Sequence, residues 1–228
     1  MPKELSFWSP SFQLERSNLS RAETETVKAM ARLKSLLHYA MQNPLFAGER
    51  TALVAPTQGR VLEIAFETEK NVPYYSPWAT DLAIVCLDAA LAEPRRGAGD
   101  RGLRIERVSP GSDTARLPFE DSHFDWAVST LTLCRTKHPD AILAEVRRVL
   151  KPSGAYLFLE HGRSADPAMS RWQARLRNLW LRYGGCDLDR EIDQMILTAG
   201  FRIEKLERYQ LGQPKFLSTM YRGVARRI

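Results

Sequence analysis

The feature of this sequence that most constrains its fold is an alternation of short apolar runs with segments of helical spacing. Five runs have the length and apolar character of buried parallel strands: Val61–Ala65, Leu82–Leu87, Leu103–Val108, Phe124–Thr130 and Ala155–Leu159. The clearest helical pattern between them is Asp140–Leu150. Such alternation predicts an α/β fold with a doubly wound, mostly parallel sheet and a ligand site beyond the carboxyl ends of its strands.

The rest of the chain after this helix continues the pattern. Lys151–Gly154, with the sequence KPSG, predicts a turn into the next strand. Two further helices are predicted at Ser170–Tyr183 and Leu188–Ala199, and two closing strands near 201–209 and 216–226. Together with the five apolar runs, these strands predict a seven-stranded sheet.

Residues 21–41 predict an amphipathic helix, with Val27, Met30, Leu33, Leu37 and Met41 at helical spacing. We expect this helix to cover the core of the domain. An interfacial helix that touches a membrane is the alternative, and the basic residues on its other faces allow it. The predicted organisation is an N-terminal helical extension at residues 1–50, followed by one α/β domain at residues 51–228.

Composition excludes several classes of protein. The 228 residues are 44% hydrophobic and 26% charged, which suits one domain with a substantial core. The sequence has no apolar run of about 18 residues and no signal-peptide pattern, so we expect a cytoplasmic protein. Three widely separated cysteines without a CxxC pair argue against a disulfide framework. The net charge is +6, but basic and aromatic residues are not interleaved, so no nucleic acid partner is expected.

Four motifs occur in a fixed order: VLEIAFETEKNVPYY, IVCLDAA, LPFEDSHFDWAVSTLTLC and EVRRVLKPSGAYLFLEHG. In this order and spacing the chain resembles the class I S-adenosylmethionine (SAM)-dependent methyltransferases over roughly residues 58–225. Within them it is similar to the branch that contains UbiE and the membrane-associated alkyl-thiol methyltransferases. The resemblance implies a Rossmann-like, methyltransferase-like domain at residues 51–228 that uses SAM.

The resemblance also implies a cofactor site by motif position. Glu63 keeps the acidic place on the first strand, Asp88 matches the carboxylate that binds the ribose hydroxyls, and Asp113 matches the neighbour of the adenine amino group. The other implied cofactor-binding residues are Ala65, Glu67, Asn71, Thr114, Ser129 and Thr130.

The loop after the first strand departs from the pattern of this class. Ala65, Glu67 and Glu69 stand where small residues are expected. A positive φ costs an ordinary residue about 1–2 kcal/mol, and both glutamates bring negative charge near the expected place of the methionine carboxylate. Three interpretations are open: a decayed pseudoenzyme, a reshaped loop with ordinary methyl transfer, or a loop in which Glu67 and Glu69 bind a hard divalent ion such as Mn²⁺.

The third interpretation agrees with a further resemblance. The carboxylate-rich loop AFETEKN resembles that of the RquA family of rhodoquinone biosynthesis. That family implies replacement of a ring methoxy group of ubiquinone by an amino group, with SAM as amino donor and manganese as metal. We therefore expect quinone-ring amination first. A conventional methyltransferase for a small lipophilic acceptor is the alternative, and a non-catalytic pseudoenzyme is the third possibility.

Catalytic candidates lie after the first and fifth predicted strands. Glu160 and His161, in LFLEHG, are candidate general bases at the edge where active sites of this fold lie. A structural hydrogen bond is the alternative role for His161. Tyr74, with Tyr75, is a candidate for stacking on an aromatic substrate, although core aromatic residues would have the same pattern. Cys134 is expected to be a buried small residue.

The predicted helix at Ser170–Tyr183 combines tryptophans with arginines. Trp172 and Trp180 lie at helical spacing, with Arg171 and Arg175 nearby. This composition suits a membrane interface at which a lipophilic quinone would enter, and equally a lid packed over the pocket. Together with the net charge of +6, it predicts peripheral contact with the inner membrane face.

Overall fold

The computed structural model describes residues 44–65, 70–87, 96–98, 102–108, 116–183, 185–212, 215 and 218–228. All of them belong to one compact unit, Gln42–Ile228. The helix predicted at residues 21–41 lies outside the described residues. The predicted domain boundary after residue 50 falls within helix α3 (Pro44–Val54), and the division into two domains stays a prediction.

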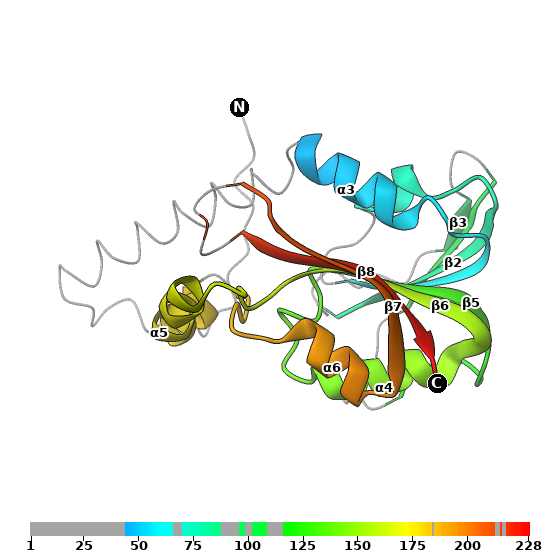
Figure 1. Ribbon diagram of the computed structural model, residues 1–228. Coiled ribbons are helices and arrows are strands. Elements are labelled where there is room, and N and C mark those ends of the chain that lie inside the picture. The colour runs from blue at the N-terminus through cyan, green and yellow to red at the C-terminus, as the bar shows by residue number, and fades with distance from the viewer. Residues whose placement is uncertain are drawn as a thin grey trace, which may run out of the picture. The chain divides into compact units, whose positions relative to one another are not determined.

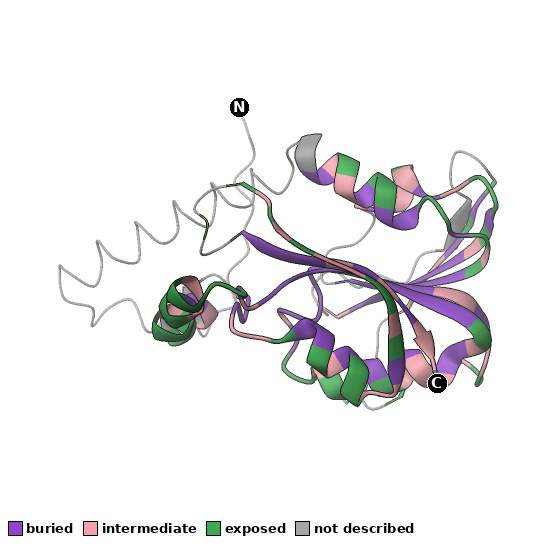
Figure 2. Cartoon of the chain, in the orientation of Figure 1, coloured by how far each residue is buried: buried purple, intermediate pink, exposed green. Residues whose placement is uncertain are grey.

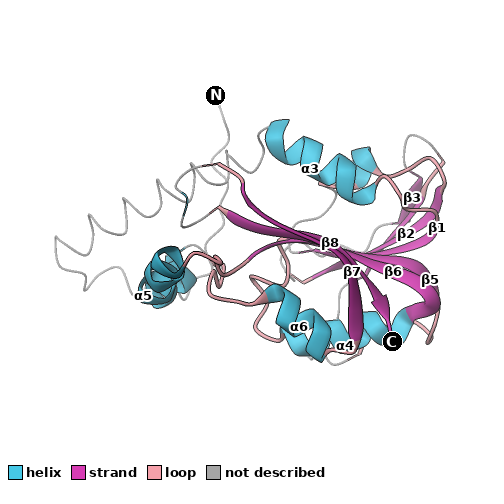
Figure 3. Ribbon diagram, viewed as in Figure 1, coloured by secondary structure: helices cyan, strands magenta, loops and turns pink. Residues whose placement is uncertain are grey.

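One eight-stranded sheet forms the centre of this unit (Figures 1 and 3). Its strands are β1 (Gly59–Ala65), β2 (Ala79–Cys86), β3 (Arg96–Ala98), β4 (Arg104–Val108), β5 (Phe124–Thr130), β6 (Leu150–His161), β7 (Phe201–Gln210) and β8 (Thr219–Arg227). Their order across the sheet is β3-β4-β2-β1-β5-β6-β8-β7. Strands β4, β2, β1, β5 and β6 are parallel, whereas β3 and β8 pair antiparallel with their neighbours.

The sheet confirms the predicted doubly wound, mostly parallel architecture. All seven predicted strands are present, and the described residues add the edge strand β3. β3 has three residues, Arg-Gly-Ala, with neither an apolar run nor a period of two that sequence reasoning could detect.

Helices pack on both faces of the sheet (Figure 1). α3 lies on one face, and α4 (Pro139–Val149) and α6 (Ile192–Thr198) lie on the other. A 3₁₀ turn, η2 (Val72–Tyr74), follows β1, and α5 (Pro167–Tyr183) follows β6. α6 begins later than the predicted Leu188, because the side chain of Asp187 accepts the backbone N–H of Asp189 at 3.2 Å and holds a turn there.

The core is continuous between the sheet and α4 and α6 (Figure 2). Leu143 and Val146 of α4 and Ile196 of α6 pack against Tyr156 and Phe158 of β6, and all five are buried. Burial of a side chain of this size contributes about 1.5–3 kcal/mol. The apolar face of α4 therefore fixes the central strands, and with them the edge at which their carboxyl ends meet.

The turn predicted at Lys151–Gly154 is instead a bulged start of β6. Phe124 pairs with Leu150, whereas Trp126 pairs with Ala155, so the register shifts between them. Gly154 is needed for this path, since a Cβ there would lie 2.9 Å from the backbone oxygen of Asp125. Gly154, which indicated a turn in the sequence, instead allows β6 to lie close to β5 in the structure.

Candidate active site

The carboxyl ends of the central parallel strands bring several predicted site residues together. Glu63 lies near the end of β1, Ser129 and Thr130 end β5, and Glu160 and His161 end β6. All five are buried polar or charged residues. A buried polar group is costly unless it is hydrogen-bonded, so the partners of these side chains define what the edge is built to do.

The first group, here called the Glu63 network, consists of Glu63, Arg50, Asn71, Tyr75 and Thr130. Tyr75 Oη donates to Glu63 Oε2 at 2.6 Å, and Asn71 Nδ2 donates to Glu63 Oε1 at 3.1 Å. Asn71 Nδ2 also donates to Thr130 Oγ1 at 2.9 Å, while Arg50 Nη1 of α3 donates to Asn71 Oδ1 at 2.6 Å. The network therefore joins α3, β1, the η2 turn and β5.

Burial is the largest influence on the pKa values of Glu63 and Tyr75 in this network. Burial raises the pKa of Glu63 above 4.5, against the hydrogen bond from Tyr75, the positive charge of Arg50 and the hydrogen bond from Asn71. Burial, with the adjacent Glu63 carboxyl, raises the pKa of Tyr75 well above 10.0. Tyr75 thus stays protonated, and its hydroxyl group donates a hydrogen bond to Glu63.

The second group, here called the Glu160 network, consists of Glu160, Ser129 and Tyr156 together with the turn after β5. Ser129 Oγ donates to Glu160 Oε1 at 2.7 Å and lies 2.7 Å from Tyr156 Oη. The backbone N–H of Cys134 donates to Glu160 Oε2 at 3.3 Å. Burial raises the pKa of Glu160, whereas the Ser129 hydroxyl and the backbone N–H groups of the turn lower it.

The turn that supplies these N–H groups begins with a strained residue. Leu131 has φ +52°, a conformation that is uncommon for a bulky side chain. Its N–H donates to Leu159 O at 2.8 Å, and Thr132 Oγ1 donates to Ile64 O at 2.9 Å. These bonds tie the end of β5 to β6 and β1, so the chain can turn sharply there and point its N–H groups at Glu160.

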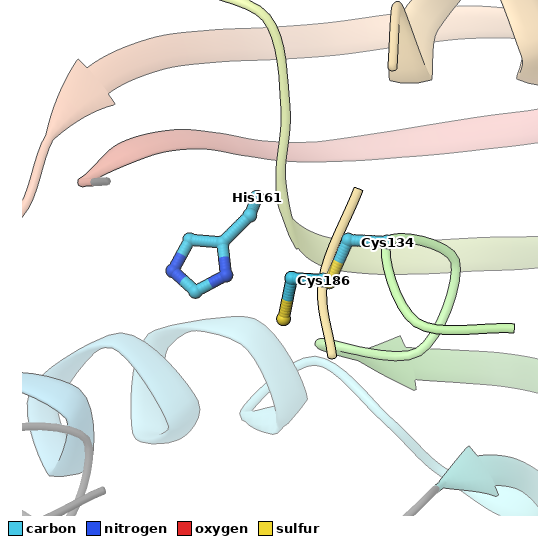
Figure 4. A group of neighbouring side chains, drawn as sticks. All are labelled: Cys134, His161 and Cys186. Atoms are coloured by element: carbon cyan, nitrogen blue, oxygen red, sulfur yellow. The ribbon is translucent and has the colours of Figure 1, made fainter. Parts of the chain in front are cut away.

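A third group was missed by sequence reasoning. Cys134, His161 and Cys186 have side-chain nitrogen and sulfur atoms that all lie within 4.8 Å of one another (Figure 4). A hydrogen bond with the Cys134 thiol is the largest cause that lowers the pKa of Cys186, and burial raises the pKa of Cys134. Sequence spacing gave no signal for this group, because its members come from three distant parts of the chain.

Several predicted site residues lie outside the described residues: Glu67, Glu69, Asp88, Asp113 and Thr114. Their predicted roles in binding SAM or Mn²⁺ stay predictions. Ala65 is buried at the end of β1. Tyr74 is half-buried in η2, and the residue that joins the Glu63 network is its neighbour Tyr75. The catalytic roles predicted for Tyr74, Glu160 and His161 stay predictions, and Glu160 has no exposed surface.

α5 has one anchored face and one exposed face. Gln173 Oε1 accepts the N–H of Ser164 at 2.8 Å, Gln173 Nε2 donates to Gly162 O at 3.2 Å, and Trp180 is buried. Trp172 is 55% exposed, with the guanidinium of Arg175 5.8 Å from its ring centroid. Both roles predicted for this helix therefore have residues that suit them. Within the described chain, no helix combines the length and the apolar character needed to cross a bilayer.

Comparisons with known proteins agree with the geometry. Residues 62–158 match the family model described as a methyltransferase domain. Human thiol S-methyltransferase TMT1B is 35% identical over 158 residues, which are 65% of this chain and 62% of the relative. Ubiquinone/menaquinone biosynthesis C-methyltransferase UbiE of Cupriavidus necator is 34% identical over 110 residues, 47% of this chain and 45% of the relative. A SAM-dependent methyltransferase structure from Methanosarcina mazei has a TM-score of 0.57 at 18% identity, with 74% of this chain and 92% of that chain covered.

These matches confirm the predicted class I methyltransferase fold, and they support the predicted class of SAM-dependent methyltransferases. The structural match concerns the fold alone. The finer resemblance to the RquA family, rhodoquinone formation and a manganese ion are not supported by any of them. The chain spans about three fifths of the length of the first curated relatives that it matches, at 62%, 63% and 62%.

Proposed function

We propose that this chain, which has the class I methyltransferase fold, transfers a methyl group from SAM to a small lipophilic acceptor. The observation that carries the proposal is the match of residues 62–158 to a methyltransferase domain, because this range contains Glu63, Asn71, Tyr75 and Thr130, which are all members of the Glu63 network except Arg50. Ligands of open α/β sheets bind beyond the carboxyl ends of the strands. Of the interpretations that the sequence left open, this one corresponds to ordinary methyl transfer through a reshaped loop.

The described residues at this edge suit a supporting role beside a bound cofactor. Glu63 is a buried carboxyl group whose two oxygens accept hydrogen bonds from Tyr75 and Asn71, so it fixes the end of β1 to the segment after the loop. We assign Glu63 and Asn71 the role of holding the chain after the loop in place, and Thr130 that of lining the crevice. When bound, SAM supplies the methyl group, which passes to the acceptor as the acceptor loses its proton.

A thiol is the acceptor that we place first. The first curated relatives are thiol S-methyltransferases from human and rat, at 31–35% identity over 157–162 residues. A quinone-type ring carbon is the second acceptor class, on the weaker ground of the shorter UbiE match. The exposed Trp172 and Arg175 of α5 suit contact with a lipid surface from which either acceptor would arrive.

Amination of a quinone ring remains a separate, finer proposal. It depends on Glu67 and Glu69 as Mn²⁺ ligands, and these residues lie outside the described part of the chain. It predicts a different product, in which a methoxy group is lost and an amino group is gained. Product analysis therefore separates the two reactions without any structural assumption.

The experiment that tests the proposed function supplies SAM with a deuterated methyl group. The full chain is incubated with an alkyl thiol or with a ubiquinone analogue, with and without Mn²⁺, and products are identified by mass spectrometry. We expect one labelled methyl group on the thiol, with activity lowered by Glu63→Gln and retained by Trp78→Ala, at an exposed side chain in the turn before β2. An aminated quinone formed only with Mn²⁺ would overturn methyl transfer in favour of the amination reaction. Neither product, together with no SAM binding, would make the chain a pseudoenzyme.

A further inference from the structure

We propose that Cys134, His161 and Cys186 form a zinc-binding site at the carboxyl edge of the sheet. Zinc binding there requires neither SAM nor the acceptor, so this proposal does not depend on the proposed methyl transfer. Their ligand atoms lie within 4.8 Å of one another, and exposed fractions of 0%, 9% and 8% place all three inside the protein. Figure 4 shows the imidazole ring with one nitrogen facing Cys186, next to Cys134.

The three residues come from separate segments that are held in place by other bonds. Cys134 and Cys186 are brought together by the backbone, since the N–H of Asp187 donates to Cys134 O at 2.6 Å. Asp187 is in turn held by Arg177, whose Nε and Nη2 lie 2.9 and 2.6 Å from its carboxylate oxygens. This bidentate pair fixes the segment that carries Cys186.

A second set of bonds fixes the other two residues. Arg190 donates through Nη1 to Leu133 O and through Nη2 to Thr136 O, and so clasps the turn that contains Cys134. Directly after His161, the N–H of Gly162 donates to Thr219 O at 3.2 Å. The cluster is therefore built into a fixed frame, as a metal site with preformed ligands requires.

Unpartnered buried polar atoms occur on His161 itself and on two segments that adjoin the cluster. Among the described residues, His161 Nδ1, Trp180 Nε1 and Thr219 Oγ1 are buried without a hydrogen-bond partner. They belong to the end of β6, to α5, which leads to Cys186, and to the start of β8 beside β6. An unsatisfied buried group costs about 1–3 kcal/mol. A cation on His161 Nδ1 would give this buried nitrogen a partner.

The donor set determines which ion fits. Two cysteine sulfurs and one imidazole nitrogen are ligands that zinc prefers, whereas Mn²⁺ and Mg²⁺ prefer oxygen. Zinc lies about 2.3 Å from sulfur and about 2.0 Å from nitrogen, so its ligands lie roughly 3.5–3.8 Å apart. Small side-chain rotations bring atoms within 4.8 Å to that spacing. Three protein ligands leave the fourth tetrahedral position to water or to an added ligand.

Metal binding to the reduced, full-length chain tests the proposal directly. Zn²⁺ is titrated by calorimetry, and Co²⁺ serves as a spectroscopic substitute because thiolate-to-cobalt charge transfer reports sulfur ligation. We expect one ion per chain and a thiolate–Co²⁺ band. We also expect His161→Ala and Cys186→Ser to lower affinity by more than the roughly 10–100-fold typical for loss of an outer-shell partner.

The matched control is Cys86→Ser, at the buried cysteine that ends β2 outside the cluster. It should keep both the stoichiometry and the band. Absence of Zn²⁺ binding by the reduced wild-type chain would overturn the proposal, and so would a Co²⁺ spectrum without sulfur charge transfer. The wild-type spectrum decides even where a variant fails to fold. SAM binding that persists in the zinc-free chain would leave the proposed methyl transfer standing independently of this site.

Discussion

Glu63 and Glu160 are two buried carboxyl groups on strands that flank β5, and they are held in different ways. Glu63 accepts hydrogen bonds from the side chains of Tyr75 and Asn71, which can rotate. Glu160 accepts from Ser129 and from the backbone N–H of Cys134, which cannot turn away without moving the chain. The comparison indicates that the Glu63 network can rearrange around a ligand, whereas the Glu160 network fixes the turn after β5.

The largest expected effect is the loss of stability when each network is broken by removal of its carboxyl group. Glu160→Ala leaves backbone donors without a partner and should lower the free energy of unfolding by about 4 kcal/mol, whereas Glu63→Ala should lower it by about 2 kcal/mol, because Asn71 keeps its bond to Thr130. Urea unfolding monitored by circular dichroism measures both values. A larger loss for Glu63→Ala than for Glu160→Ala would contradict the contrast.

The second effect concerns the phenol of Tyr75. Tyr75→Phe removes the donor that lies 2.6 Å from Glu63 and should destabilise the protein by about 2 kcal/mol. Tyr74→Phe is the matched control, since this half-buried neighbour is not a member of the Glu63 network, and it should change stability by less than about 0.5 kcal/mol. Equal losses in thermal or urea unfolding would mean that Tyr75 does not carry the network.

A third effect is the dependence of stability on pH. Burial raises the pKa of Glu160 above 4.5, so the folded state binds its proton more tightly than the unfolded chain does. This contribution is fully present below pH 4.5 and is lost as the pH rises through the raised pKa. Relative to Glu160→Gln, the wild type should therefore lose stability with rising pH, by at most about 1.4 kcal/mol per pH unit.

Unfolding of wild type and Glu160→Gln between pH 4 and 8 measures this difference, because carboxyl groups elsewhere in the chain are common to both proteins. A difference that stays constant with pH, or that moves in favour of the wild type, would show that folding does not raise the pKa of Glu160.

The smallest expected effect concerns the contribution of the Thr132 hydroxyl to the stability of the turn after β5. Thr132→Val keeps the shape of the side chain and removes the hydroxyl that donates to Ile64 O at 2.9 Å, which should cost about 1 kcal/mol. If the turn exists to present N–H groups to Glu160, the cost should shrink in a Glu160→Gln background. Strict additivity of the two changes in a double-mutant cycle would separate the turn from Glu160.

Sequence reasoning predicted the fold well because the signals are local. The apolar runs of β1, β2 and β5 and the helical pattern of α4 each lie within a dozen residues. β3 was missed because three residues carry no periodic pattern. Gly154 was placed in a turn, since its close approach to Asp125 depends on a strand that is distant in sequence.

The sequence predicted only part of the site, because several of its contacts join segments that are distant in sequence. The family resemblance implied one site for Glu63, Ser129 and Thr130 by motif position, and they lie at one edge because the carboxyl ends of parallel strands meet there. The hydrogen bond from Tyr75 to Glu63 was not predicted, because it depends on the path of the chain through the η2 turn. Cys186 joins Cys134 and His161 only through tertiary packing, which no spacing in the sequence reveals.

The most direct test of the central claim is a calorimetric titration of the full chain with SAM, run in parallel on Glu63→Gln. We predict binding of one SAM per chain without added metal, and weaker binding by Glu63→Gln, because the Glu63 network supports the edge at which we propose that the cofactor binds. A chain that folds and binds no SAM, with or without Mn²⁺, would contradict the account and leave the methyltransferase fold without its cofactor.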